Sequence, residues 1–133
     1  MSQDNIKLEV VTPEGAVFSG MVSSINAPAE QGALGVLYNH APLMTTLDIG
    51  VLEYTTGGVK KRMAVFGGFL EVKENQITVL ADIAELAESI DGARAEQAMA
   101  RARKRLAEKE AMLDVARAEA AINRATVRLA ILR

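Results

Sequence analysis

The sequence predicts an α+β protein in which an N-terminal β-sandwich, residues 1–86, is followed by a C-terminal two-helix hairpin, residues 87–133. Composition gives the first reason, because all 3 Pro, all 10 Gly, 2 Tyr and 3 Phe lie at or before Gly92. Periodicity gives the second reason. Short apolar segments separated by turn formers precede Gly92, whereas Ala, Arg, Glu and long aliphatic residues at helical spacing follow it.

The N-terminal part carries the signals of short strands joined by turns. Ile6, Leu8 and Val10 alternate with charged residues, which is the period-two pattern of a half-buried strand. Residues 56–58 predict a hairpin turn, because glycine accepts the positive φ that such turns require. Strands this short favour a sandwich, with a small barrel as the alternative. The expected strands are 6–10, 17–18, 21–27, 51–55, 59–66, 69–72 and 77–80.

Two stretches interrupt this strand pattern. Gly67 and Gly68 lie between strand-like segments and predict a β-bulge or a close approach of two backbones. A phosphate-binding loop is disfavoured, because its lysine and its glycine spacing are absent. Residues 32–43 read as a long loop that contains the only histidine, His40. One histidine without a second His or Cys cannot complete a metal site, and no recognisable nucleophile adjoins it. We therefore expect His40 to hold the loop or to contact a partner.

The C-terminal part predicts two helices that pack closely. Ser89 or Asp91 can cap the first helix, because a short oxygen-bearing side chain accepts hydrogen bonds from unpaired backbone N–H groups. Alanine-rich stripes let two antiparallel helices approach each other. The first stripe comprises Ala95, Ala98, Met99, Ala102, Leu106 and Leu113, and the second comprises Val115, Ala118, Ile122, Ala125, Leu129 and Leu132.

The turn of the expected hairpin has no helix breaker. Residues 109–113 are good helix formers, and Asp114 can cap a second helix. The same residues can also continue as one helix of about 42 residues, roughly 60 Å long. The sequence is therefore compatible with an ordinary helical hairpin that has a soft turn, and also with an element that switches between two states.

Charge is distributed unevenly between the two parts. Residues 1–92 hold 5 Lys and Arg against 12 Asp and Glu, a net charge of −7, and residues 93–133 hold 10 against 5, a net charge of +5. A basic tail favours an acidic partner or a phosphorylated ligand. Arg94 and Arg101 share one face of the first helix, as Arg124 and Arg128 share one face of the second. Folded together, they either form a cluster suited to phosphate oxygens or remain solvated surface arginines.

Several functional classes are disfavoured. The chain has no cysteine, which excludes disulfides and thiolate metal sites, and with one His no catalytic constellation is recognisable. No apolar run approaches the roughly 20 residues of a membrane-spanning helix, and the first residues lack the features of a signal peptide. We therefore expect an intracellular protein without enzymatic activity that meets a membrane only through a partner. Nucleic-acid binding is disfavoured because the basic tail has no aromatic ring on which bases could stack.

Along essentially its whole length the chain resembles the epsilon subunits of bacterial F-type ATP synthases. The resemblance is carried by residues 10–15 (VVTPEG), 32–43, 67–72 (GGFLEV) and 90–95 (IDGARA). It departs from the common family pattern at Ala33, often acidic in relatives, and at Tyr38-Asn39, where relatives often have Pro-Gly.

The resemblance implies a non-catalytic subunit of the central stalk that couples rotation to catalysis. Its partners would be the gamma subunit, the rotor ring of c subunits and the alpha/beta catalytic head, at the cytoplasmic face of the bacterial cell membrane as a peripheral protein. The mobile C-terminal hairpin would inhibit ATP hydrolysis when it extends into the head. His40 is the residue expected to contact a partner.

The resemblance also implies a site for ATP on the folded hairpin. ATP would act there as a regulatory ligand that stabilises the non-inhibitory form, with no prosthetic group, and whether magnesium accompanies the nucleotide is left open. The alternative is a coupling and inhibitory subunit without physiological ATP sensing. The residues implied to bind ATP are Glu85, Ile90, Asp91, Arg94, Ala95, Arg101, Arg124 and Arg128.

Overall fold

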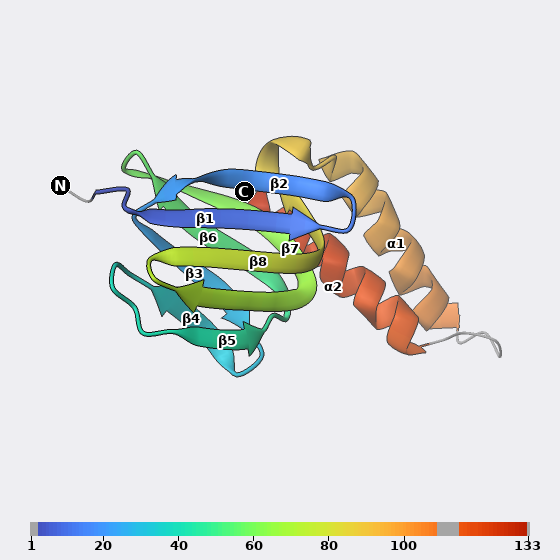
Figure 1. Ribbon diagram of the computed structural model, residues 1–133. Helices are drawn as coiled ribbons and strands as arrows, with labels where there is room; N and C mark the ends of the chain where they lie inside the picture. The colour runs from blue at the N-terminus through green and yellow to red at the C-terminus, as the bar shows by residue number, and fades with distance from the viewer. Residues whose placement is uncertain (1–2, 109–114, 133) are drawn as a thin grey trace.

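The computed structural model describes residues 3–108 and 115–132. It shows an N-terminal β-sandwich followed by two helices that lie side by side at one end of it (Figure 1). The strands are β1 (Ile6–Thr12), β2 (Gly15–Val22), β3 (Ser24–Ala29), β4 (Gly32–Val36), β5 (Leu43–Thr46), β6 (Ile49–Thr56), β7 (Val59–Lys73) and β8 (Gln76–Leu86). A 3-10 turn, η1 (Ala87–Ser89), leads to the helices α1 (Gly92–Glu108) and α2 (Val115–Ile131).

The strands form one continuous hydrogen-bonded sheet in the order β2-β1-β8-β7-β6-β3-β4, with β5 paired to β7. The pair β1–β8 is parallel and the other pairs are antiparallel. The long strand β7 pairs with β6 up to Phe66 and with β5 from Phe69 onward. One strand therefore contributes to both layers of the sandwich.

Gly67 and Gly68 mark the point at which β7 changes partners. The register between β7 and β8 is the same on both sides of these glycines, so the predicted β-bulge is not present there. The predicted close approach of two backbones is confirmed by the atoms that a side chain on Gly68 would meet. Both residues have positive φ, +74° and +109°. A Cβ atom on Gly68 would lie 2.1 Å from the carbonyl oxygen of Leu80, so only glycine fits between these strands. The predicted strands 59–66 and 69–72 are thus parts of one strand.

The prediction of a loop over residues 32–43 is wrong in its first half. Gly32–Val36 is the strand β4, which pairs with β3 in the register Ile25↔Val36 to Ala29↔Gly32. Glycine and alanine have low intrinsic strand propensity, and here the pairing with β3 overrides it. The expected strand 21–27 is likewise divided between β2 and β3, and β5 was not expected. His40 lies in the remaining connection between β4 and β5.

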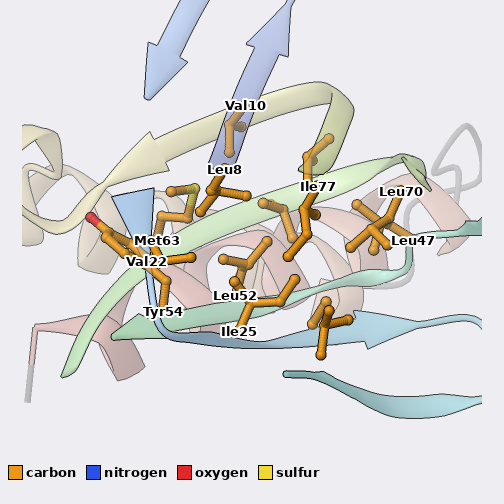
Figure 2. Close-up of a cluster of buried hydrophobic side chains, with 14 of the residues drawn as sticks. Leu8, Val10, Val22, Ile25, Leu47, Leu52, Tyr54, Met63, Leu70 and Ile77 are labelled. Carbon is orange, nitrogen blue, oxygen red and sulfur yellow. The ribbon is translucent and has the colours of Figure 1, made fainter. Parts of the chain in front are cut away.

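The main core lies between the two layers of the sandwich (Figure 2). Leu8, Leu52 and Ile77 are completely buried there, each from a different strand. The predicted alternation of β1 is confirmed, because Ile6, Leu8 and Val10 are buried while the residues between them are partly exposed.

The two helices pack through small side chains, as the stripes predict. Ala95 and Ala102 of α1 and Ala118 and Ala125 of α2 are all buried. α1 leads away from the sandwich and α2 returns toward it (Figure 1), which is the hairpin arrangement rather than a single long helix. No helix within residues 3–108 and 115–132 combines the length and apolarity needed to cross a membrane.

The end of α2 docks on the outer face of the sandwich. Ile131 is buried against Ala64 and Phe66 of β7 in a second, smaller apolar cluster, to which Val127 also contributes. The predicted stripe is therefore wrong at its ends, since Val115 and Leu132 are 51% and 44% exposed. Helical rotation turns Ile131, not Leu132, toward the sheet. The expectations for Leu113 and Asp114 lie outside the described residues.

Candidate functional site

Asp91 caps the start of α1. The backbone N–H of Arg94 donates to Asp91 Oδ1 at 3.1 Å, and the N–H of Ala95 donates to the Asp91 carbonyl oxygen at 3.0 Å. Ser89, the other predicted cap, belongs instead to the preceding 3-10 turn. Capping fixes the first turn of α1, and with it the position from which the Arg94 side chain departs.

A hollow of about 310 Å³ opens where β8, the linker and the two helices meet. Residues from all four elements form its wall, so the hollow exists in this form only while the hairpin lies against the sandwich. Its lining residues are Glu85, Ser89, Ile90, Asp91, Arg94, Ala95, Ala98, Arg101 and Arg128.

The charged groups of the hollow favour an anion. Arg94, Arg101 and Arg128 contribute three positive charges, and Glu85 and Asp91 contribute two negative charges, which leaves a formal charge of +1. One oxygen of Asp91 already accepts the helix-capping hydrogen bond. Guanidinium groups present planar pairs of N–H donors that match phosphate or carboxylate oxygens.

Arg128 is held by two residues of the sandwich. Its Nε donates to Glu85 Oε1 at 2.5 Å, and its Cζ lies 4.9 Å from the ring centroid of Phe66. The Arg128 and Glu85 side chains are only 25% and 29% exposed. An ion pair at this depth is screened less by salt than a surface pair is. Arg128 is thus fixed to the body of the protein although it belongs to α2.

The structure brings together seven of the eight residues implied to bind ATP. Arg124 is half-buried on α2 and is not among the residues that line this hollow. Ser89 and Ala98 line it as well, although the sequence suggested only a cap for the former and helix packing for the latter. Ala98 lies between Arg94 and Arg101 at helical spacing, and this spacing could have identified it.

His40 lies apart from the hollow, on the loop between β4 and β5. Its Nδ1 is 2.6 Å from the carbonyl oxygen of Ala41, and because a carbonyl only accepts, Nδ1 carries the proton. The neighbouring Asn39 has φ +63° and exchanges hydrogen bonds with Asn75, its N–H donating at 2.7 Å and its side-chain oxygen accepting at 3.2 Å. Asparagine tolerates this left-handed conformation better than most residues with a side chain do.

Exposed apolar side chains surround this loop. Leu37, Tyr38 and Met44 are 67%, 53% and 65% exposed. Large apolar side chains gathered on one loop and its neighbouring strand mark a surface suited to a protein partner. From the sequence, only His40 was predicted to contact a partner here. In the part of the chain that the structure describes, no group of three or more His, Cys, Asp or Glu could hold a metal ion.

Two family models together match nearly the whole chain. The ATP synthase delta/epsilon chain β-sandwich domain matches residues 5–87, and the ATP synthase delta/epsilon chain long α-helix domain matches residues 88–133. The ATP synthase epsilon chain of Carboxydothermus hydrogenoformans is 53% identical over 106 residues, covering 80% of this chain and 79% of that protein. The epsilon chain of Pelotomaculum thermopropionicum is 52% identical over 109 residues, covering 82% and 81%.

Solved structures agree in fold. A chain of the Euglena gracilis mitochondrial ATP synthase, determined as OSCP/F1/c-ring in rotational state 1, superposes with a TM-score of 0.81 at 23% identity, covering 100% of this chain and 84% of that one. At this identity the likeness shows the fold alone. The family models and the bacterial relatives establish the family, and this chain therefore belongs to the delta/epsilon chains of ATP synthase, as an epsilon subunit.

Proposed function

We propose that this epsilon subunit regulates ATP hydrolysis through its hairpin and that ATP binds the hollow between the hairpin and the sandwich. The observation that carries the proposal is the convergence of Arg94, Arg101 and Arg128 with Glu85 beside the capped start of α1. Phosphate oxygens would accept hydrogen bonds from the guanidinium groups and from N–H groups of the first helical turn. Glu85 would accept a hydrogen bond from an amino group such as that of adenine.

Such a ligand would act on the position of the hairpin. Glu85 belongs to the sandwich, Arg94 and Arg101 to α1, and Arg128 to α2. A molecule that touches all of them favours the docked hairpin over any arrangement that separates these elements. The docked form gains RT ln(1 + [ATP]/Kd) in free energy, and it loses this gain when free ATP falls below the dissociation constant.

The released hairpin would then extend along the gamma subunit toward the alpha/beta head and inhibit ATP hydrolysis. The net charge of +5 on residues 93–133 supports an acidic receiving surface. Arg103 and Arg105 are exposed on α1 in the docked form, outside the hollow, and are available for such contacts.

The sandwich would meet the stalk and the rotor ring. The loop that contains His40, with exposed Leu37 and Tyr38, provides the contact surface on the side of the c subunits. The Euglena assembly that holds the structurally similar chain also contains F1 and a c-ring, and we extend this association to the present chain. The subunit would thus lie at the cytoplasmic face of the cell membrane through its partners.

Calorimetric titration of ATP into the isolated chain tests the proposal. We expect saturable binding that weakens about tenfold or more in Arg94→Ala, because a hydrogen bond to a charged group contributes about 1.5–3 kcal/mol. Asp91→Ala should weaken binding through the loss of the cap. Arg103→Ala is the matched control, an exposed arginine of α1 that does not line the hollow, and should bind like the unmodified chain.

Undetectable binding by every chain would reject ATP sensing and leave a coupling and inhibitory subunit. Equal binding by all four chains would place the nucleotide somewhere other than this hollow. Titrations with and without magnesium would show whether the cation accompanies ATP.

A further inference from the structure

We propose that Phe66 is a positioning residue of the nucleotide site, which acts by holding Arg128 from the sandwich side. This inference rests on the proposed function and adds to it a residue that contacts no ligand itself. Phe66 is not among the residues that line the hollow, and it reaches the site only through the guanidinium group above its ring, 4.9 Å from the centroid.

Sheet register places Phe66 and Glu85 on the same face. Ala64 of β7 lies opposite Glu85 of β8, and Phe66 follows two residues later on β7. Residues two apart on a strand share a face, so Phe66 and Glu85 are diagonal neighbours across the pair. Long side chains reach across this spacing, and here both reach the same arginine. The sheet therefore places Phe66 and Glu85 where both side chains contact the guanidinium group of Arg128 when α2 is docked.

The ring is itself fixed in place. Phe66 is 5% exposed and packs with Ala64 and Ile131, with Val127 and Ile90 at the edge of the cluster. A ring confined in this way can turn little, so the plane of the arginine above it is confined as well. Arginine has five N–H donors, and Glu85 engages the one on Nε. Within residues 3–108 and 115–132, Arg128 bonds to Glu85 through Nε, and its terminal nitrogens are the donors proposed to meet the ligand.

The two contacts of Arg128 have different consequences. The carboxylate of Glu85 fixes one end of the guanidinium group but also offsets its charge. The aromatic ring attracts the cation through its quadrupole and adds no negative charge to the site. Because Phe66 already restricts the Arg128 side chain, that side chain loses less conformational freedom when an anion binds. The positive charge of Arg128 stays available to the anion. Because Phe66 lies on the sandwich and Arg128 on α2, the arginine is prepared for ATP only when α2 is docked.

A double-mutant cycle in ATP affinity tests this role. Phe66→Leu removes the ring and keeps an apolar side chain, and Arg128→Gln removes the charge. Measured by calorimetry on the full chain, Phe66→Leu should weaken ATP binding roughly three- to thirtyfold, the range of one cation–π contact. In the Arg128→Gln background the same substitution should change the affinity less than twofold, because the group through which Phe66 acts is gone.

Ile131→Val is the matched control. It trims a buried side chain of the same apolar cluster and leaves the Phe66 ring in place, so any loss of ATP affinity it causes should persist unchanged in the Arg128→Gln background. Circular dichroism and urea unfolding of every variant confirm that it is folded. If the loss of ATP affinity caused by Phe66→Leu persists in the Arg128→Gln background, Phe66 acts through general packing and the proposal is overturned. Full ATP affinity in Phe66→Leu would overturn it as well.

A second readout needs no nucleotide. The Nε–H resonance of Arg128 in a ¹H–¹⁵N spectrum should carry a ring-current shift that disappears in Phe66→Leu, and an unchanged resonance would overturn the contact itself. Undetectable ATP binding by the unmodified chain would reject the proposed function and the positioning role together. Normal binding by the unmodified chain and by Phe66→Leu would reject only the role of Phe66.

Discussion

Gly68 shows how one missing side chain permits a strand to change partners. A Cβ atom there would lie 2.7 Å from the Cα of Ala81, and φ is +109°, so both space and backbone conformation require glycine. Gly68→Ala should lower the free energy of unfolding by about 2–5 kcal/mol, combining overpacking with the unfavourable φ. Urea unfolding measures this loss.

Gly35→Ala is the control for this substitution. A Cβ atom on Gly35 would meet nothing within 4 Å, so the same chemical change should leave stability within about 0.5 kcal/mol. Comparable losses in the two variants would contradict the proposed steric reason.

Tyr54 links the stability of the sandwich to alkaline pH. Burial raises the pKa of Tyr54 above 10.0, and the Glu88 carboxylate raises it further. The folded state therefore keeps a proton that the unfolded state loses, so the contribution is complete below about pH 10 and is lost as pH rises toward the folded pKa. Above about pH 10, the free energy of unfolding should therefore fall more steeply with pH in the unmodified chain than in Tyr54→Phe.

The comparison with Tyr54→Phe is needed because lysines also titrate in this range. Both proteins contain the same lysines, so the difference between the two slopes belongs to Tyr54. Parallel slopes would show that the raised pKa does not contribute to stability.

Single residues of the site were predictable to different degrees. Asp91 and Arg94 could be identified from sequence because a helix cap and its neighbours are adjacent in the chain. Phe66 could not be, because its role depends on a register between strands and on the docking of α2. The ion pair between Arg128 and Glu85 joins residues 43 positions apart, a distance over which no local pattern operates.

At the level of elements, strands with clear alternation were predictable and strands with small residues were not. Most of β6 and β7 was expected from apolar residues between turn signals, whereas only residues 77–80 of β8 were expected. β4 contains two glycines and an alanine among its five residues, so only its pairing with β3 makes it a strand. The helical stripes correctly predicted the buried alanines. They did not predict that Ile131 faces the sheet, because the orientation of the last turn of α2 depends on its packing against β7.

Close packing of the hairpin depends on alanine at the contact between α1 and α2. Ala125 is 1% exposed, so Ala125→Leu should force the helices apart and lower the free energy of unfolding by about 1–3 kcal/mol. Ala116→Leu, at an exposed position of the same helix, should leave it nearly unchanged. Thermal unfolding followed by circular dichroism compares the two, and equal melting temperatures would contradict close packing at Ala125.

On the scale of the whole molecule, the hollow joins two parts that the sequence already distinguishes. The acidic sandwich has its own core, whereas the basic hairpin is tied to it by the small cluster around Phe66 and Ile131 and by the Arg128–Glu85 ion pair. So small a contact can be opened at moderate cost. Under the proposed function, a ligand that spans this contact would shift the balance between the docked form and an extended form.

The distance between the hairpin and the sandwich tests this central claim most directly. The natural chain has no cysteine, so Lys61→Cys on β7 and Glu119→Cys on α2, both exposed, provide two unique sites for spin labels. Pulsed electron paramagnetic resonance should show one narrow distance with saturating ATP and an additional, longer population without it, and Arg94→Ala should reduce the effect of ATP. An identical distance distribution with and without ATP would contradict the claim.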